Sequence, residues 1–421
     1  MNAKRVLAGC FGAILLLSAG RAAAAEDNTF KVYWKDGIRG ESGDGAFKWK
    51  LGGRMQYDAS FYDQDGQNQK LFGEVHDGFA FRRARFELEG TIYERFIFKT
   101  QYDFADGNPA IKDMYVGMTG VPWLGRLRFG QAYEPISIDQ LTSSKYSEYL
   151  ERGLTTTFTG DRNPGIMANN SFLGDRITYQ AGIFRNGSDI SGNSDGDGTW
   201  SATGRLTGLP WYGDENQLLH LGLGLRYVNV AGKTSFAARP ESKQAPKMAD
   251  TKSFDANSYL VVGPEAVFLY GPFSLQGEYM HVTTDAPAVG DPTFGAYTAS
   301  ASWWITGESR KFKTDVAEFD RVKPKRNLFQ SGGLGAWELT LRYSNLDLND
   351  SNIVSGVQKG IAGGQMGDIT AGVNWQWNPN MRMMFNYVHS DLKNDTKDPS
   401  NNIIRVGSNV DSFSVRWQVD F

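Results

Sequence analysis

The stretch "FKWKLGGRMQYDASF", residues 47–61, alternates apolar and polar side chains along its length. One parity holds Phe47, Trp49, Leu51, Met55, Tyr57 and Phe61, and the other holds Lys48, Lys50, Arg54, Gln56 and Asp58. Successive side chains of a β-strand point to opposite faces, so this stretch predicts a strand with one apolar side and one side that faces water.

The same alternation returns in "LLHLGLGLRYV" (218–228), "AWELTLRYS" (336–344) and "DSFSVRWQVDF" (411–421). No segment after Glu26 shows a sustained helical period or an apolar run of about 18 residues. Short turns such as "YGPF" alternate with long polar loops, which is typical of an outer-membrane barrel. About sixteen such segments lie between Phe47 and Phe421, an even number as in bacterial barrels. The predicted fold class is therefore all-β, a 16-stranded antiparallel transmembrane β-barrel.

The strands of a soluble β-sandwich also alternate apolar and polar side chains, but a sandwich buries its apolar face in a core. Here the apolar parity is dominated by Trp, Tyr and Phe near the strand ends, as in the aromatic girdles of a membrane barrel. The last strand ends in Phe421 after matched apolar residues at Phe413, Val415, Trp417 and Val419. This resembles the C-terminal signature by which outer-membrane barrels are recognised for assembly.

The N-terminus reads as an export signal. Lys4 and Arg5 precede an apolar run, and small residues end at Ala25, so residues 1–25 are predicted to be a cleaved signal peptide. The apolar run is too short for a membrane anchor. "LAGC", which ends at Cys10, lacks the apolar stretch that a lipid-attachment site needs before it. Cleavage would remove Cys10 and three basic residues, leaving a cysteine-free chain of net charge −6 instead of −3. Residues 26–46 are then an N-terminal periplasmic segment, and residues 47–421 form the barrel.

The stretch "FRRARFELEG", residues 81–90, concentrates arginines on a predicted strand. If Phe86 faces lipid, then Arg83 and Arg85 face the lumen together with the acids that follow. An arginine on the lipid face at the bilayer midplane would cost roughly 2–4 kcal/mol, which a water-filled lumen removes. Arg82 has the opposite parity, and we expect it at the outer end of the strand, where a bulge or snorkelling accommodates it.

Parity assigns many other charged residues to the lumen. The basic ones are Arg54, Lys99, Arg126, Arg128, Arg205, Arg226, Arg342, Arg382 and Arg416, and the acidic ones are Asp58, Glu87, Glu89, Asp103, Asp113 and Glu338. Guanidinium groups stay charged and bind oxyanions through two N–H donors, so they can pass an anion along a wall. Conduction also requires that each site bind the anion weakly enough for the anion to leave.

Five stretches resemble the phosphate-selective porins of the O and P type in the Gram-negative outer membrane. They are "KLGGRMQYD" (50–58), "FRRARFELEG", "LRFGQAYEPISIDQLTSSKYSEYLERGL" (127–154), "LGDRITYQAGIFRNG" (173–187) and "ITGESRKFKTDVAEFDRVKP" (305–324). The resemblance implies a homotrimer of sixteen-stranded barrels in outer-membrane lipid, with an inward-folded third loop and phosphate or other small anions as the solute.

The resemblance also carries individual positions. Arg54, Arg82, Arg83 and Asp113 match the lumen wall of the family, and Lys145 and Arg152 fall in the inward-folded loop. Arg85 stands where some members carry an aromatic residue, so phosphate, polyphosphate and other anions all remain open as the preferred solute. The predicted anion pathway is therefore Arg54, Arg82, Arg83, Arg85, Lys99, Asp113, Arg126, Arg128, Lys145 and Arg152.

Two further basic segments have open roles. The fifth long loop carries Lys233, Arg239, Lys243 and Lys247, which either attract anions to the mouth or form a solvated loop. The basic run at 309–326 follows the twelfth segment and is predicted on the periplasmic side, where it either draws anions or contacts another subunit.

Other chemistry is weakly supported by the sequence. "NSDGDG" begins like a calcium loop with Asn193, Asp195 and Asp197, but its twelfth position is Gly204 instead of glutamate. The four histidines, His76, His220, His281 and His389, lack metal-ligand spacing. No nucleotide-binding or serine-hydrolase motif appears, and the dispersed basic residues do not predict a nucleic-acid partner. We therefore expect no enzyme activity, metal or cofactor. A general porin, a barrel enzyme or an adhesin remains as the alternative.

Overall fold

The structure is a computed structural model, and it describes residues 29–105, 107–185, 198–354, 357–397, 400 and 402–421. The predicted signal peptide and the candidate calcium residues Asn193, Asp195 and Asp197 lie outside these residues. No helix in the described part of the chain is long and apolar enough to span a membrane.

The main sheet has eighteen strands, of which β1 (Lys31–Trp34) and β2 (Ile38–Glu41) form an appended hairpin. The remaining sixteen make the barrel, as predicted. They are β3 (Phe47–Gln64), β4 (Gly78–Ile92), β5 (Phe96–Asp103), β6 (Ala110–Val121), β7 (Gly125–Tyr133), β8 (Arg162–Phe172), β9 (Ile177–Arg185), β10 (Trp200–Asp214), β11 (Gln217–Thr234), β14 (Phe254–Tyr270), β15 (Phe273–Asp285), β16 (Thr293–Trp304), β19 (Ala336–Val354), β20 (Val357–Asn378), β21 (Met381–Lys397) and β22 (Ile403–Asp420).

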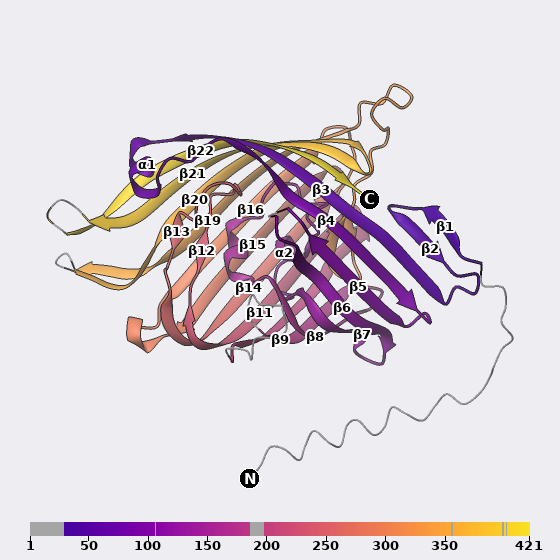
Figure 1. Cartoon of the computed structure of the whole chain (residues 1–421), viewed down its shortest axis with the longest axis horizontal. Helices are drawn as coiled ribbons and strands as arrows, with labels where there is room; N and C mark the ends of the chain where they lie inside the picture. The colour runs from indigo at the N-terminus through magenta and orange to yellow at the C-terminus, as the bar shows by residue number, and fades with distance from the viewer. Residues whose placement is uncertain (1–28, 106, 186–197, 355–356, 398–399, 401) are drawn as a thin grey trace, which may run out of the picture.

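The barrel closes between its first and last strands. β22 pairs antiparallel with β3 from Val410↔Gln64 to Asp420↔Arg54, and the two strands lie side by side at the top of Figure 1. The terminal residue extends this ladder, because the Phe421 amide donates to the Gly53 carbonyl at 3.1 Å. Closure leaves neither strand with a free edge in the membrane, where an unpaired backbone group costs several kcal/mol.

The alternation seen in the sequence separates the two faces of the wall. On β11 the side chains of Leu221, Leu223 and Leu225 are exposed outward, whereas His220 and Arg226, of the opposite parity, are buried inside. Outward apolar side chains match the hydrocarbon of a bilayer, and inward polar side chains line the lumen.

Connections of different lengths lie at the two ends of the barrel. Most turns at one end span two to four residues, such as 93–95 and 271–272, while most connections at the other end are longer. The short-turn end has one long exception, the segment 305–335, which contains β17 (Lys311–Lys313) and β18 (Glu318–Asp320). The β1–β2 hairpin lies at this same end and pairs with the start of β3 through Ile38↔Leu51.

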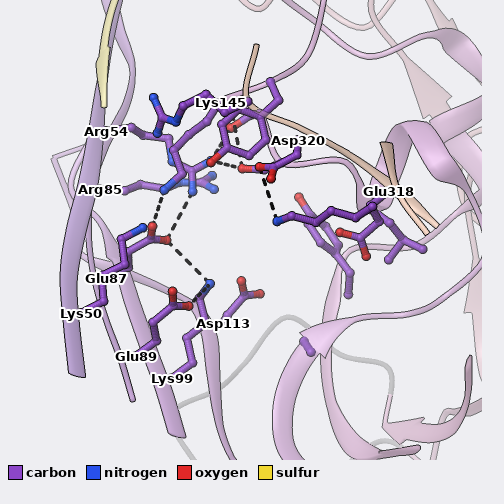
Figure 2. Close-up of a pocket in the computed structure, with 18 of the residues that line it drawn as sticks. Lys50, Arg54, Arg85, Glu87, Glu89, Lys99, Asp113, Lys145, Glu318 and Asp320 are labelled. Carbon is purple, nitrogen blue, oxygen red and sulfur yellow. Dashed lines mark hydrogen bonds and ion pairs between the residues drawn. The ribbon is translucent and has the colours of Figure 1, made fainter. Parts of the chain in front are cut away.

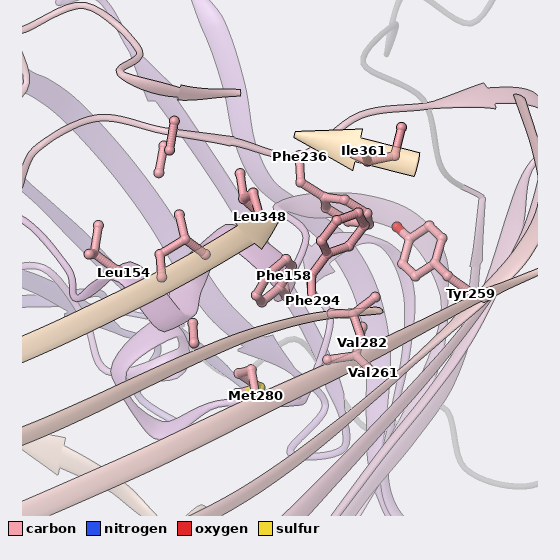
Figure 3. Packing of buried hydrophobic residues seen from close by; sticks show 14 of the residues in the cluster. Leu154, Phe158, Phe236, Tyr259, Val261, Met280, Val282, Phe294, Leu348 and Ile361 are labelled. Atoms are coloured by element: carbon pink, nitrogen blue, oxygen red, sulfur yellow. The ribbon is translucent and has the colours of Figure 1, made fainter. Parts of the chain in front are cut away.

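A cluster of buried apolar side chains fills part of the lumen (Figure 3). We call it the apolar plug, and its members include Leu154 and Phe158 from the third long loop, Phe236 from the fifth, and Val261 and Phe294 from the wall. The fifth long loop (235–253) contains β12 (Ala237–Ala238) and β13 (Ala249–Asp250), and η3 (Pro287–Val289) lies in the sixth. The apolar plug keeps water from its side of the barrel, so an aqueous passage must run along another part of the wall.

Candidate functional site

The third long loop, residues 134–161, has contacts with lumen-facing residues on opposite sides of the barrel. It contains α2 (Ile138–Leu141) and η2 (Leu154–Phe158). The backbone N–H of Ile138 donates to Glu265 Oε2 at 2.9 Å on one wall. The backbone N–H of Leu150 donates to Asn386 Oδ1 at 2.9 Å on another. These contacts hold loop three inside the barrel from two sides.

A second segment enters the lumen from the short-turn end. Arg310 of segment 305–335 pairs with Glu148 of loop three at 2.9 Å, and the Phe319 amide donates to Thr142 Oγ1 at 3.4 Å. Phe312 and Phe319 are buried against Ile138 of loop three. The prediction for residues 309–326 located the correct end of the barrel, but it did not foresee that the segment folds inward and meets loop three.

Between these two segments and the wall lies a cavity of about 520 Å³, which we call the central cavity. Its lining carries thirteen Lys and Arg side chains against six Asp and Glu, although the whole chain has a net charge of −3. Figure 2 shows Arg54, Arg85 and Lys145 together on one side of it and Glu318 and Asp320 on the other. The positive excess favours anions, because a charged cleft with low-dielectric walls concentrates the opposite charge.

Glu87 occupies the centre of the cationic side. Its carboxylate is in ion-pair contact with Lys145, and it lies 3.5 Å from Arg54 Nη2 and 3.8 Å from Lys99 Nζ. Arg54 also donates from Nη1 to Ser144 Oγ at 2.7 Å, which ties the wall to loop three. Three predicted residues, Arg54, Lys99 and Lys145, are therefore brought together around one acid.

Two further arginines that line the same cavity, Arg85 and Arg162, are ion-paired. Arg85 Nε lies 2.6 Å from Asp103 Oδ2, and Arg162 Nε lies 2.6 Å from Asp113 Oδ1. The Arg162 guanidinium also lies 3.7 Å from the centre of the Tyr133 ring. A paired guanidinium keeps some of its five N–H donors, so pairing with a carboxylate does not exhaust its capacity to bind an anion.

A β-bulge explains the parity of Arg82. The register of β3 and β4 shifts between Gln56↔Arg83 and Tyr57↔Phe81, which leaves Arg82 as the extra residue. The bulge lies within β4, and it turns Arg82 inward, where Arg82 Nε lies 2.5 Å from Glu151 of loop three. A bulge was one of the two alternatives expected for Arg82, the other being snorkelling, but Arg82 lies within β4 and contacts loop three instead of lying at the outer end of the strand.

Arg82 and Arg83 differ from Arg85 in their surroundings. Arg83 is buried and donates from Nη1 to Gln56 Oε1 at 2.8 Å, and neither arginine is part of the lining of the central cavity. Parity thus places Arg83 on the lumen side, but the expectation that it looks into the passage is not met. Arg85, two residues along, does line the cavity.

This difference gives a matched pair of variants. Arg85→Ala removes a cavity charge and leaves Asp103 without its partner, so we expect anion conductance in a planar bilayer to fall by roughly threefold. Arg83→Ala should lower thermal stability while the anion-to-cation permeability ratio stays at the parent value. Equal losses of conductance in the two variants would contradict this assignment of roles.

The remaining predicted residues have different surroundings. Arg128 lines the central cavity and donates to Asn169 Oδ1 at 3.1 Å. Arg126 lines a separate recess of about 340 Å³ beside the β1–β2 hairpin. Arg152 also lines the central cavity, yet it donates to the carbonyls of Asp139, Gln140 and Thr142 at 2.7, 2.9 and 3.0 Å. Arg152 therefore also braces loop three.

A second cavity, of about 450 Å³, lies toward the long-loop end and shares Arg162 with the central one. Lys112, Arg226 and Lys233 line it, so the positive lining continues outward. Of the other residues predicted in the fifth loop, Arg239 donates to the loop carbonyls of Lys243 and Ala245 at 3.2 and 2.6 Å. It therefore shapes the loop.

Several residues of the central cavity were not predicted from the sequence. Arg39 lies on the hairpin, Arg162 at the start of β8, and Lys311, Lys313, Arg321 and Lys323 in the inward segment. The signal for the segment was present in "RKFKTDVAEFD" (310–320), because two phenylalanines in a charged run need an apolar place to pack.

The histidines show no shared site. His220 is buried against Glu265 at 2.8 Å, whereas His389 lies 2.8 Å from Asp411 on other strands. Among the residues that the structure describes, no three His, Cys, Asp or Glu side chains are grouped as metal ligands.

Comparisons with known proteins agree with this architecture. Residues 49–421 match the family model of the phosphate-selective porins O and P. Porin O of Pseudomonas aeruginosa is 29% identical over 390 residues, which cover 84% of this chain and 85% of the relative. An uncharacterised protein of Caulobacter vibrioides is 27% identical, covering 87% of this chain and 73% of its own.

Solved structures of low sequence identity share the fold. The trimer form of OmpT of Vibrio cholerae has a TM-score of 0.54 at 11% identity, covering 89% of this chain and 100% of its own. The outer-membrane channel DcaP of Acinetobacter baumannii has a TM-score of 0.52 at 13% identity, covering 90% and 99%. With its family model matched over nearly the whole barrel, the chain belongs to the phosphate-selective porin O and P family of the outer membrane.

Proposed function

We propose that this outer-membrane porin is an anion-selective diffusion channel that carries phosphate and related anions. The observation that supports the proposal most is the central cavity, where Lys and Arg outnumber Asp and Glu by thirteen to six in a chain of net charge −3. Arginine forks and lysine ammonium groups are the ligands that phosphate oxygens favour. The name of the family points to the same solute.

The proposed path has three stages. An anion enters through the outer cavity beside Lys112 and Lys233, passes Arg162, and reaches the central cavity around Arg54 and Lys145. The acidic side chains among these cations lower the affinity of each site for the anion, and conduction requires such weak binding. No covalent chemistry is needed, and membership of a porin family favours a channel over an enzyme or an adhesin.

Reconstitution in a planar bilayer tests the proposal. With a KCl gradient across the membrane, we expect a reversal potential of the sign that anion permeation gives, and added phosphate should reduce the chloride current by competing for the same cations. The general-porin alternative predicts weak selectivity and no phosphate effect. A cation-selective reversal potential would refute anion selectivity, and an unchanged chloride current would refute phosphate preference.

We also propose that the chain is exported by cleavage after Ala25 and assembles as a homotrimer in outer-membrane lipid, with residues 26–46 on the periplasmic side. The composition of the N-terminus supports export, and the trimer form of the OmpT barrel, which has the same fold, supports a trimer. N-terminal sequencing of the membrane-extracted protein tests the first, and its molar mass in detergent tests the second.

A further inference from the structure

Glu87 is held by more cations than the other acids of the central cavity whose partners the described residues show. Lys145, Arg54 and Lys99 surround it, and Gln101 Nε2 also donates to its Oε2 at 2.5 Å. By contrast, Glu89 has one ion-pair partner within the described part of the chain, Lys99 at 3.2 Å. The Glu87 side chain is 5% exposed and that of Glu89 is 41% exposed, although they lie two residues apart on β4.

The donors around Glu87 form the kind of site that an oxyanion occupies. Two ammonium groups, one guanidinium and one amide converge on a pair of carboxylate oxygens, and they come from β3, β5 and loop three. The contacts with Lys145 and Gln101 are hydrogen bonds, and Arg54 and Lys99 add positive charge at 3.5 and 3.8 Å. A charge-assisted hydrogen bond is roughly twice as strong as a neutral one. The same donors fit two oxygens of a phosphate, so the carboxylate and a passing anion would compete for them.

We propose that Glu87 is a tethered competitor of the transported anion. Its carboxylate fills the strongest anion position of the central cavity, and a phosphate occupies this position only by displacing it. This inference rests on the proposed function and adds the reason why the anion leaves again. Because Glu87 is covalently attached, it returns to its cations as soon as the phosphate moves on, and the phosphate is not trapped.

Substitution of glutamine for Glu87 tests this role, with Glu89→Gln as the matched control. Both changes remove one negative charge from the same wall and keep the side-chain volume. For Glu87→Gln the inorganic phosphate concentration that halves the chloride current should fall by roughly threefold or more, because the competing charge is lost. The maximal phosphate current should fall as well, because the anion leaves more slowly. For Glu89→Gln the shift should be smaller, since Glu89 neutralises one cation at the cavity edge.

The outcomes separate this inference from the proposed function. If phosphate does not reduce the chloride current of the parent protein, the proposed function fails. If the parent is blocked but Glu87→Gln shows no shift, or the same shift as Glu89→Gln, the tethered competitor is refuted and the channel stands. Should Glu87→Gln not fold, Glu87→Asp retains the charge but withdraws it from Lys145, and it should shift the half-blocking concentration in the same direction by a smaller factor.

Discussion

The chloride current of the protein is expected to fall by roughly tenfold as the pH rises from about 7 to about 9, because Lys145 loses its charge in this window. Burial of the Lys145 ammonium, together with repulsion from Arg54, lowers its pKa to about 8, although Glu87 opposes the shift. With a pKa of about 8, Lys145 is mostly a cation at pH 7 and mostly neutral at pH 9. Losing one charge in a confined lumen weakens anion binding by more than it would in bulk water.

Two variants isolate Lys145 in this experiment. Lys145→Gln should give a low current with little dependence on pH between about 7 and about 9, and Lys145→Arg should give a current that stays high, because a guanidinium does not titrate there. Chloride is the permeant ion because, unlike phosphate, it does not change its own charge in this range. A parent-like decline in the Lys145→Arg variant would contradict the assignment to Lys145.

The stability of the protein should change in the opposite direction to its current. The folded pKa of Lys145, about 8, lies below the ordinary value of 10.5, so the unfolded chain binds more protons between these two values. The contribution of Lys145 to the free energy of unfolding therefore increases as the pH rises from about 8 to 10.5. A current that falls while thermal stability holds or improves distinguishes loss of the charge from loss of the fold.

Glu151→Ala is expected to destabilise the folded barrel by at most about 3–5 kcal/mol, the cost of leaving a buried charge without its partner, because the Arg82 and Glu151 side chains are 19% and 16% exposed. Arg82 Nε and Nη2 donate to Glu151 at 2.5 and 2.8 Å, and Arg416 Nη2 lies 3.2 Å away. Arg416 keeps Asp58 at 2.6 Å, but Arg82 has no other carboxylate among its described contacts. Loop three should then loosen near Arg82, while its contact with Glu87 through Lys145 remains, so the pore should conduct more and select less.

Urea titration of the protein in detergent gives the free energy of unfolding and so measures the loss of stability. Glu151→Gln keeps a hydrogen-bond acceptor and should cost less. The double variant Glu151→Ala with Arg82→Ala removes both charges and should recover part of the lost stability. A double-mutant cycle measures this coupling between the two residues. If Glu151→Ala alone changes the free energy of unfolding by less than about 1 kcal/mol, the pair contributes no more than an exposed ion pair.

The wall of the barrel could be predicted from the sequence because its rule is local. A period of two fixes the face of each residue, and it assigned Leu221, Arg226 and Arg342 correctly. The rule fails where the backbone gains a residue, as at Arg82. A second register shift, between Thr100↔Met114 and Tyr102↔Ile111, lets Lys112 and Asp113 both line cavities although they are adjacent. A bulge leaves little trace in composition, so parity alone cannot locate it.

The contents of the lumen were harder to predict than its wall. Loop three was placed inside by resemblance. The charged run at 309–326 was expected on the periplasmic side, drawing anions or contacting another subunit, because nothing in its local pattern shows that it folds inward. Its inward position depends on contacts with residues distant in sequence, such as Arg205 donating to the Ala317 carbonyl at 2.9 Å. The partners of Glu87 come from three other elements, and no local pattern brings them together.

The apolar plug has a consequence for how solute range can evolve. The apolar plug and the inward-folded segments occupy much of the lumen. The width of the pore is therefore set by these inserted loops and not by the number of strands in the barrel. Replacing the third loop in the same barrel would change which solutes pass through the pore, and it would leave the lipid-facing surface unchanged. Solute preference and membrane insertion are thus separate problems for selection in this molecule.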